Sequence, residues 1–72
     1  MNENVKKRFG RKIRILRDER HLSREKLAEA VDLSAYYIGQ IERGECNLTF
    51  NNMINLADVF GVEVGELFDF RF

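Results

Sequence analysis

Three places in the chain repeat one short arrangement of apolar and polar residues. A leucine precedes a serine or threonine, and an apolar residue follows four positions after that hydroxyl residue. The three instances are Leu22-Ser23 with Leu27, Leu33-Ser34 with Ile38, and Leu48-Thr49 with Met53. A hydroxyl at an N-cap accepts a hydrogen bond from an unpaired backbone N–H, and the preceding apolar residue packs on the fourth helical residue. The arrangement therefore predicts three helix starts.

The first two of these starts lie close enough to predict a helix-turn-helix. Their serines are 11 positions apart, from 23 to 34, which leaves room for about two turns of helix and a short turn. We expect a helix over 24–31, a turn at Asp32-Leu33, and a second helix from Ala35 to about Arg43 that Gly44 stops. Two short helices joined this tightly are a common device for placing a helix in the major groove of DNA.

Hydrophobic periodicity predicts three further helices. The first runs from about 4 to 20, the second spans 50–60 and ends at Gly61, and a short one near 64–68 lacks a good cap. The apolar stripes expected to face the core are Val5, Phe9, Ile13 and Leu16 in the first helix, Leu27, Ala28 and Val31 in the helix over 24–31, and Phe50, Met53, Ile54, Ala57 and Phe60 in the helix over 50–60. The fold class that follows is a compact all-α bundle of five helices.

Composition narrows the function classes. The 72 residues are 44% hydrophobic and 33% charged, as expected for one folded domain, with a core over about 5–68 and an aromatic tail at 69–72. A single cysteine, Cys46, and a single histidine, His21, provide neither a disulfide nor a metal cluster. We therefore expect no enzyme activity, no metal and no cofactor. No apolar run is long enough to span a membrane and no secretory signal opens the chain, so a cytoplasmic, nucleoid-associated protein is expected.

The net charge is zero, but the charges are unevenly distributed. Residues 1–26 carry ten basic and four acidic side chains, whereas residues 27–72 carry two basic and eight acidic ones, so the halves have charges of +6 and −6. A dipolar molecule of this kind can present a basic face to phosphate. The alternative is a basic helix face that is simply solvated.

The second helix of the predicted helix-turn-helix has one free face. At 100° per residue, Ile38 and Ile41 point in a common direction, with Glu42 beside them. The opposite face comprises Tyr36, Gln40 and Arg43, flanked by Ala35 and Tyr37, with Gly39 between Ala35 and Tyr36. Glutamine can bond adenine, arginine can bond guanine or phosphate, and alanine can touch a thymine methyl. This face therefore has the chemistry to read bases, although both tyrosines could instead cover the edge of the core or contact a protein.

A long series of residues points to one family. It comprises Phe9-Gly10, Ile13, Leu16-Arg17, Leu22-Ser23-Arg24-Glu25, Leu27-Ala28, Leu33-Ser34, Ile38, Ile41-Glu42-Arg43-Gly44, Asn47-Leu48-Thr49, Leu56-Ala57, Phe60-Gly61-Val62 and Glu66-Leu67. With this series the chain resembles, over about residues 9–68, the Cro/phage-repressor (XRE-type) helix-turn-helix regulators. Short members of that family include the controller proteins of restriction–modification systems and many small repressors.

The resemblance implies a lambda-repressor-like fold and a sequence-specific transcriptional regulator that binds a palindromic double-stranded DNA operator as a homodimer. It places base contacts at Ala35, Tyr36 and Gln40, and phosphate contacts at Arg24, Arg43 and Asn47. Ser34 would cap the recognition helix. It also implies a structural ion pair between Arg17 and Glu42.

Two features depart from the family pattern. Family members often have glutamine where Arg24 stands, so this chain keeps the ability to bind phosphate but loses a neutral side chain that can bond to the recognition helix. The paired tyrosines and the neutral total charge are also unusual. Both departures bear on the operator sequence more than on the function.

The chain ends in alternating aromatic residues, Phe68, Phe70 and Phe72. Alternation is typical of a strand, but three aromatic rings can also dock on the helix over 50–60 or on a second subunit. Leu56 and Val59 would widen that apolar patch. We therefore expect this helix, the last helix and the tail to form a two-fold dimer contact. The alternative is that the tail closes the core of a monomer.

A competing function is a protein-interaction module, such as an antitoxin-type partner built on the same fold. It differs from a DNA-binding regulator in one measurable respect. Phosphate binding weakens steeply as salt rises, whereas a module that binds only protein has no such affinity for DNA.

Overall fold

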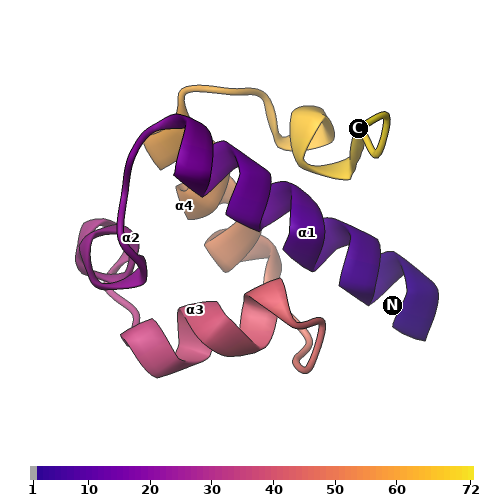
Figure 1. Ribbon diagram of the computed structural model, residues 1–72, viewed down its shortest axis with the longest axis horizontal. Helices are drawn as coiled ribbons and strands as arrows, with labels where there is room; N and C mark the ends of the chain where they lie inside the picture. Colours follow the sequence, from indigo (N-terminus) through magenta and orange to yellow (C-terminus); the bar gives the residue numbers. More distant parts are fainter. Residues whose placement is uncertain (1) are drawn as a thin grey trace.

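The computed structural model describes residues 2–72, and within that range all of its regular elements are helices. The elements, in chain order, are α1 (Glu3–Glu19), α2 (Arg24–Val31), α3 (Ala35–Glu42), α4 (Phe50–Phe60) and the 3-10 helix η1 (Val64–Phe68). Figure 1 shows α1 crossing the molecule, with α3 along one edge and η1 with the tail along the opposite edge. The predicted all-α fold is confirmed, except that the fifth element is a 3-10 helix. It has only five residues and no side-chain cap, as is usual for 3-10 segments.

Each of the three predicted helix starts is capped by the expected hydroxyl. Ser23 accepts a hydrogen bond from the backbone N–H of Lys26, and Ser34 from that of Tyr37, both at 3.0 Å. Thr49 does the same for Asn52 at 3.1 Å. The chain leaves each of the four α-helices through left-handed backbone, at His21, Asp32, Gly44 and Gly61. Local sequence therefore fixes both ends of the helix-turn-helix.

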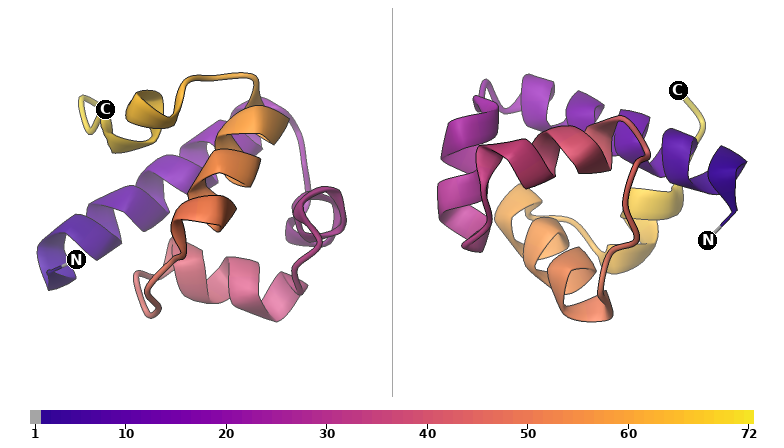
Figure 2. Two further views of the ribbon diagram at one scale, coloured as in Figure 1. Left: turned by 180° about the vertical axis from the view of Figure 1, so that it is seen from behind. Right: turned by 90° about the horizontal axis from the view of Figure 1, so that it is seen from below.

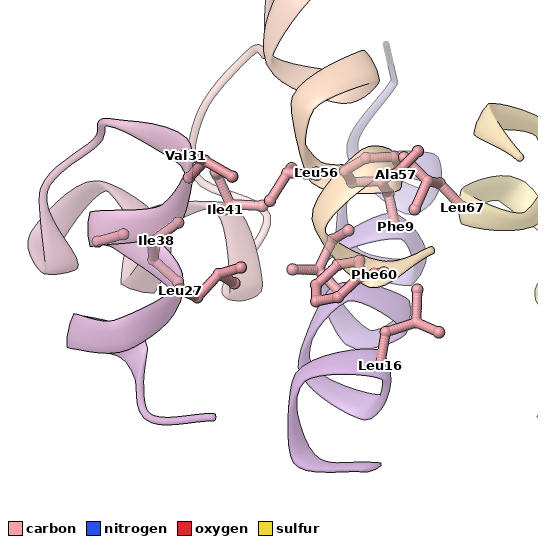
Figure 3. Close-up of a cluster of buried hydrophobic side chains, with 12 residues drawn as sticks. Phe9, Leu16, Leu27, Val31, Ile38, Ile41, Leu56, Ala57, Phe60 and Leu67 are labelled. Carbon is pink, nitrogen blue, oxygen red and sulfur yellow. The ribbon is translucent and has the colours of Figure 1, made fainter. Parts of the chain in front are cut away.

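One hydrophobic core joins all five elements (Figure 3). Its members are Phe9, Ile13 and Leu16 from α1, Leu27, Ala28 and Val31 from α2, Ile38 and Ile41 from α3, Leu56, Ala57 and Phe60 from α4, and Leu67 from η1. Apolar burial of this kind contributes roughly 25 cal/mol per Å². Within residues 2–72, no helix combines the length and the apolar character needed to cross a membrane.

The prediction of which side of α4 faces the core was wrong by a rotation about the helix axis. Phe50 and Ile54, expected in the core, are 69% and 41% exposed, whereas Leu56, expected outside it, is completely buried. Apolar residues surround more than half of this helix, so its sequence is compatible with more than one buried stripe. Packing against α2 and η1 selects the stripe through Leu56 and Phe60.

The aromatic tail folds back onto α1 of its own chain and forms no strand within the described residues. The rings of Phe9 and Phe68 are 5.0 Å apart between centroids. The Arg8 guanidinium lies 5.5 Å from the Phe70 ring centroid and the Arg11 guanidinium 5.0 Å from that of Phe72, within the range of cation–π attraction. An ion pair of 2.8 Å between Lys12 Nζ and Glu66 Oε2 also ties η1 to α1. The tail therefore has partners within the monomer.

Candidate nucleic-acid interface

Helix α3 is held directly against the backbone of α1. A Cβ atom on Gly10 would lie 2.6 Å from the Glu42 carbonyl oxygen, so only glycine allows α1 to approach the end of α3 this closely. Ile38 and Ile41, on the inner side of α3, are essentially fully buried. Seen from below, α3 lies at the front of the molecule with no other element over it (Figure 2). Its outer face is therefore rigidly supported and open.

The strip formed by Tyr36, Gln40 and Arg43 lies on this open face. Tyr36 is 73% exposed, Arg43 is exposed, and Gln40 is half-buried. Arg43 Nε donates a 3.0 Å hydrogen bond to Glu45 Oε2 in the following loop, and this contact raises the pKa of the Arg43 guanidinium. Gly39, expected on this face, is instead buried. An added Cβ there would lie 3.0 Å from Arg43 Nη1, because the Arg43 side chain lies over it.

The residues that flank the strip differ in their environment. Ala35 is half-buried. Ser34 is exposed, and its hydroxyl oxygen accepts the capping hydrogen bond from the backbone N–H of Tyr37. Tyr37 is half-buried and packs against the core, where burial raises its pKa. Its hydroxyl lies 3.4 Å from the backbone oxygen of Asn47, itself an exposed residue of the loop into α4. Tyr37 thus covers the edge of the core while its polar end reaches the loop.

Behind the strip, one carboxylate holds two arginines. Arg17 Nε donates to Glu42 Oε2 at 2.6 Å, and Arg17 Nη2 donates to Glu42 Oε1 at 3.2 Å. Arg17 also bonds the Leu22 carbonyl oxygen at 2.8 Å and so ties in the turn before α2. Its hydrogen bonds to Glu42 raise the pKa of the Arg17 guanidinium. The ion pair implied by the resemblance is therefore present, and its carboxylate is 97% buried, since only 3% of the Glu42 side chain is exposed.

The second arginine on this carboxylate is Arg24, the first residue of α2. Arg24 Nε donates to Glu42 Oε1 at 3.0 Å, and 42% of the Arg24 side chain is exposed. The sequence predicts that arginine here gives up a neutral bond to α3, and in the structure an ionic hydrogen bond to Glu42 joins Arg24 to that helix. No sequence signal indicates this contact, which joins residues 18 positions apart on different helices.

Three basic residues of α1, Lys7, Arg11 and Arg14, are exposed and lie on one face of the helix, spaced i, i+4 and i+7. Lys12 and Arg17 are buried in ion pairs, and Arg20 bonds the Phe60 carbonyl oxygen at 3.0 Å. Arg8 and Arg11 lie over rings of the tail, at the edge of the molecule opposite α3 in Figure 1. The fold thus uses part of the positive charge of residues 1–26, in Lys12, Arg17 and Arg20. Arg43 belongs to the open strip, and Arg24 is bonded to Glu42 at the end of α3.

Known proteins share both this sequence and this architecture. Residues 13–67 match the model of the helix-turn-helix family. Control protein C.BamHI of Bacillus amyloliquefaciens is 38% identical over 71 residues, which cover 97% of this chain and 88% of that protein. The crystal structure of the restriction–modification controller protein C.AhdI from Aeromonas hydrophila superposes with a TM-score of 0.82 at 38% identity, over 85% of this chain and 92% of that one.

A further solved structure, the DNA-binding domain of BldD, has a TM-score of 0.83 at 33% identity and covers 93% of this chain and 97% of that domain. The matched family, the sequence relatives and the solved structures all point to the family that the sequence resembles. The chain therefore belongs to the Cro/phage-repressor (XRE-type) helix-turn-helix family of DNA-binding transcriptional regulators, which are not enzymes.

Proposed function

We propose that this regulator binds a palindromic operator as a homodimer and inserts α3 into the major groove, acting on the nucleoid in the cytoplasm. The observation that carries this proposal is the open strip of Tyr36, Gln40 and Arg43 on a helix whose other side is fully buried. A major groove about 12 Å wide accepts such a helix. In a two-fold dimer, the two copies of α3 would lie about 34 Å apart, one turn of B-DNA.

Within this proposal the side chains divide into base readers and phosphate contacts. Gln40 offers an amide that can bond adenine bidentately, and Ala35 and Tyr36 stand at the entering end of α3, where they can touch thymine methyls or bases. Arg24, Arg43 and Asn47 contact phosphates on either side of the groove. Ser34 orients α3 through its cap, and Tyr37 supports the loop that carries Asn47.

The relatives favour a specific regulatory role. Controller proteins of restriction–modification systems align with nearly the whole chain. We propose the same role for this chain, with its operator in front of genes of such a system. The genomic position of an operator found by selection tests this role.

Selection from a random duplex pool should return a palindrome with the wild-type protein. With Gln40→Ala, one position in each half-site should become degenerate, because the lost amide contributes roughly 1–3 kcal/mol of base discrimination. Asn55→Ala, which removes an exposed amide on α4, is the matched control and should return the wild-type motif. An unchanged motif with Gln40→Ala would show that Gln40 does not read bases.

For the dimer, we propose an interface centred on the outer edge of α4. Phe50 and Ile54 are four residues apart, so they lie on the same side of this helix, and both are strongly exposed. Figure 2 places α4 and η1 on the same side of α1, so Phe68, which is 39% exposed, can extend the contact. The tail contributes less, since Phe70 and Phe72 already contact arginines of their own chain.

Sedimentation of two variants separates the parts of this interface. Phe50→Ser combined with Ile54→Ser should sediment as a monomer, because both substitutions remove apolar area that a partner would cover. A chain truncated after Phe68 should remain a dimer. The reverse pattern, in which only the truncation dissociates the protein, would move the interface to the tail.

A further inference from the structure

Glu42 has more hydrogen-bond partners than its burial requires. Arg17 alone satisfies the carboxylate, because it donates to both oxygens through Nε and Nη2. The additional bond from Arg24 brings a second cation to the same group. The two guanidinium groups share this one carboxylate, and Arg24 is the more exposed of the two arginines. Arg17 also lies 3.5 Å from Asp18.

The Arg24 contact occupies only one end of its guanidinium. Among residues 2–72, the sole side-chain partner of Arg24 is Glu42, through Nε. The two terminal Nη groups therefore remain available as donors. Arginine donors form a planar fork, so fixing Nε also fixes the direction in which both Nη groups point.

The position of Arg24 makes this direction relevant to DNA. Arg24 is the first residue of α2, an eight-residue helix whose N-terminus attracts anions. Glu42 is the last residue of α3 and is anchored to α1 through Arg17. One buried carboxylate thus fixes both the end of the recognition helix and the side chain placed to meet the DNA backbone.

We propose that Glu42 is a positioning residue for phosphate binding, which holds Arg24 by Nε so that its two Nη groups bind a backbone phosphate oxygen of the operator. This inference rests on the proposed function. It gives Glu42 a role beyond its ion pair with Arg17. Because Glu42 ends α3 and also holds Arg24, the orientation of α3 and the position of the protein along the phosphate backbone depend on each other. An acidic residue therefore strengthens binding to a polyanion.

Glu42→Gln tests this role with a nearly isosteric change. Glutamine keeps one acceptor oxygen. At the Oε2 position this oxygen accepts only from Arg17, and at the Oε1 position it accepts from both arginines through neutral bonds, so the charged bond that holds Arg24 is lost in either orientation. Measured against the selected operator duplex by fluorescence anisotropy, the affinity of the dimer should fall roughly a hundredfold, because one charged hydrogen bond is lost in each of its two protomers. The slope of log affinity against log salt should become shallower by about 0.9 per protomer. A purely electrostatic effect would act oppositely, because removing a negative charge would tighten binding.

Glu29→Gln is the matched control, since it removes an exposed carboxylate of α2 that bonds no arginine within residues 2–72. It should leave binding unchanged or tighten it. Arg24→Ala should reproduce the loss seen with Glu42→Gln, and the double variant should bind no more weakly than Arg24→Ala alone. Circular dichroism at the assay temperature establishes that each variant is folded.

Arg24→Lys provides an independent test if Glu42→Gln does not fold. Lysine keeps the charge but has a single ammonium group, which cannot bond Glu42 and a phosphate as a rigid fork does. We expect several-fold weaker binding with an unchanged salt slope. Wild-type affinity in Arg24→Lys or in folded Glu42→Gln would overturn the inference alone, whereas a wild-type protein that binds no duplex would overturn the proposed function itself.

Discussion

Replacing Arg17 by alanine is expected to lower the free energy of unfolding by about 3–5 kcal/mol. The substitution removes both bidentate bonds to a carboxylate of which only 3% is exposed, together with the bond to the Leu22 carbonyl oxygen. Arg24 remains on one oxygen of Glu42, so the cost should lie toward the lower end of this range. Urea unfolding at pH 7, followed by circular dichroism, measures it.

Arg14→Ala is the matched control for this prediction. Arg14 lies one turn earlier on α1 and pairs with Asp18, but both side chains are more than half exposed. Exposed pairs contribute little, so this variant should lose less than about 1 kcal/mol. Equal losses for the two variants would mean that burial of the Arg17–Glu42 pair has no energetic consequence and that α1 is held to α3 by apolar contacts alone.

The contrast between these two arginines shows what the sequence can predict in this fold. Helix starts depend on neighbours within four residues, so Ser23, Ser34 and Thr49 could be identified directly. The open face of α3 could also be predicted, because an eight-residue helix with two isoleucines on one side has only one way to bury them. Both inferences use local geometry alone.

Predictions failed where two distant elements had to meet. The rotation of α4 depends on which of its apolar residues meet α2 and η1, and the sequence allows several stripes. The contacts of Arg24 with Glu42 and of Lys12 with Glu66 join residues that only the folded chain brings together. The uneven charge distribution does not by itself locate a DNA-binding face, because Lys12, Arg17 and Arg20 hold part of the positive charge in contacts within the fold.

This use of basic residues sets the expected salt dependence of DNA binding. Counting only Arg24 and Arg43 gives four cationic phosphate contacts in a dimer. Log affinity falls with log salt with a slope of about −0.9 per phosphate contact, hence about −3.6 here. Between 50 and 200 mM salt, the affinity of the wild-type protein for its operator should therefore fall by about two orders of magnitude.

Anisotropy titrations of the selected operator duplex across this range measure the slope, and Arg43→Ala should make it shallower by about 1.8 in the dimer. Arg71→Lys is the charge-conserving control, because Arg71 is an exposed residue of the tail, on the edge of the molecule opposite α3 (Figure 1). A slope nearer −8 would require further phosphate contacts from exposed basic residues such as Lys7, Arg14 and Lys26. A protein-interaction module of the antitoxin type that binds only protein would have no measurable affinity for duplex DNA even at 50 mM salt, so that result would assign the open strip of α3 to a protein partner.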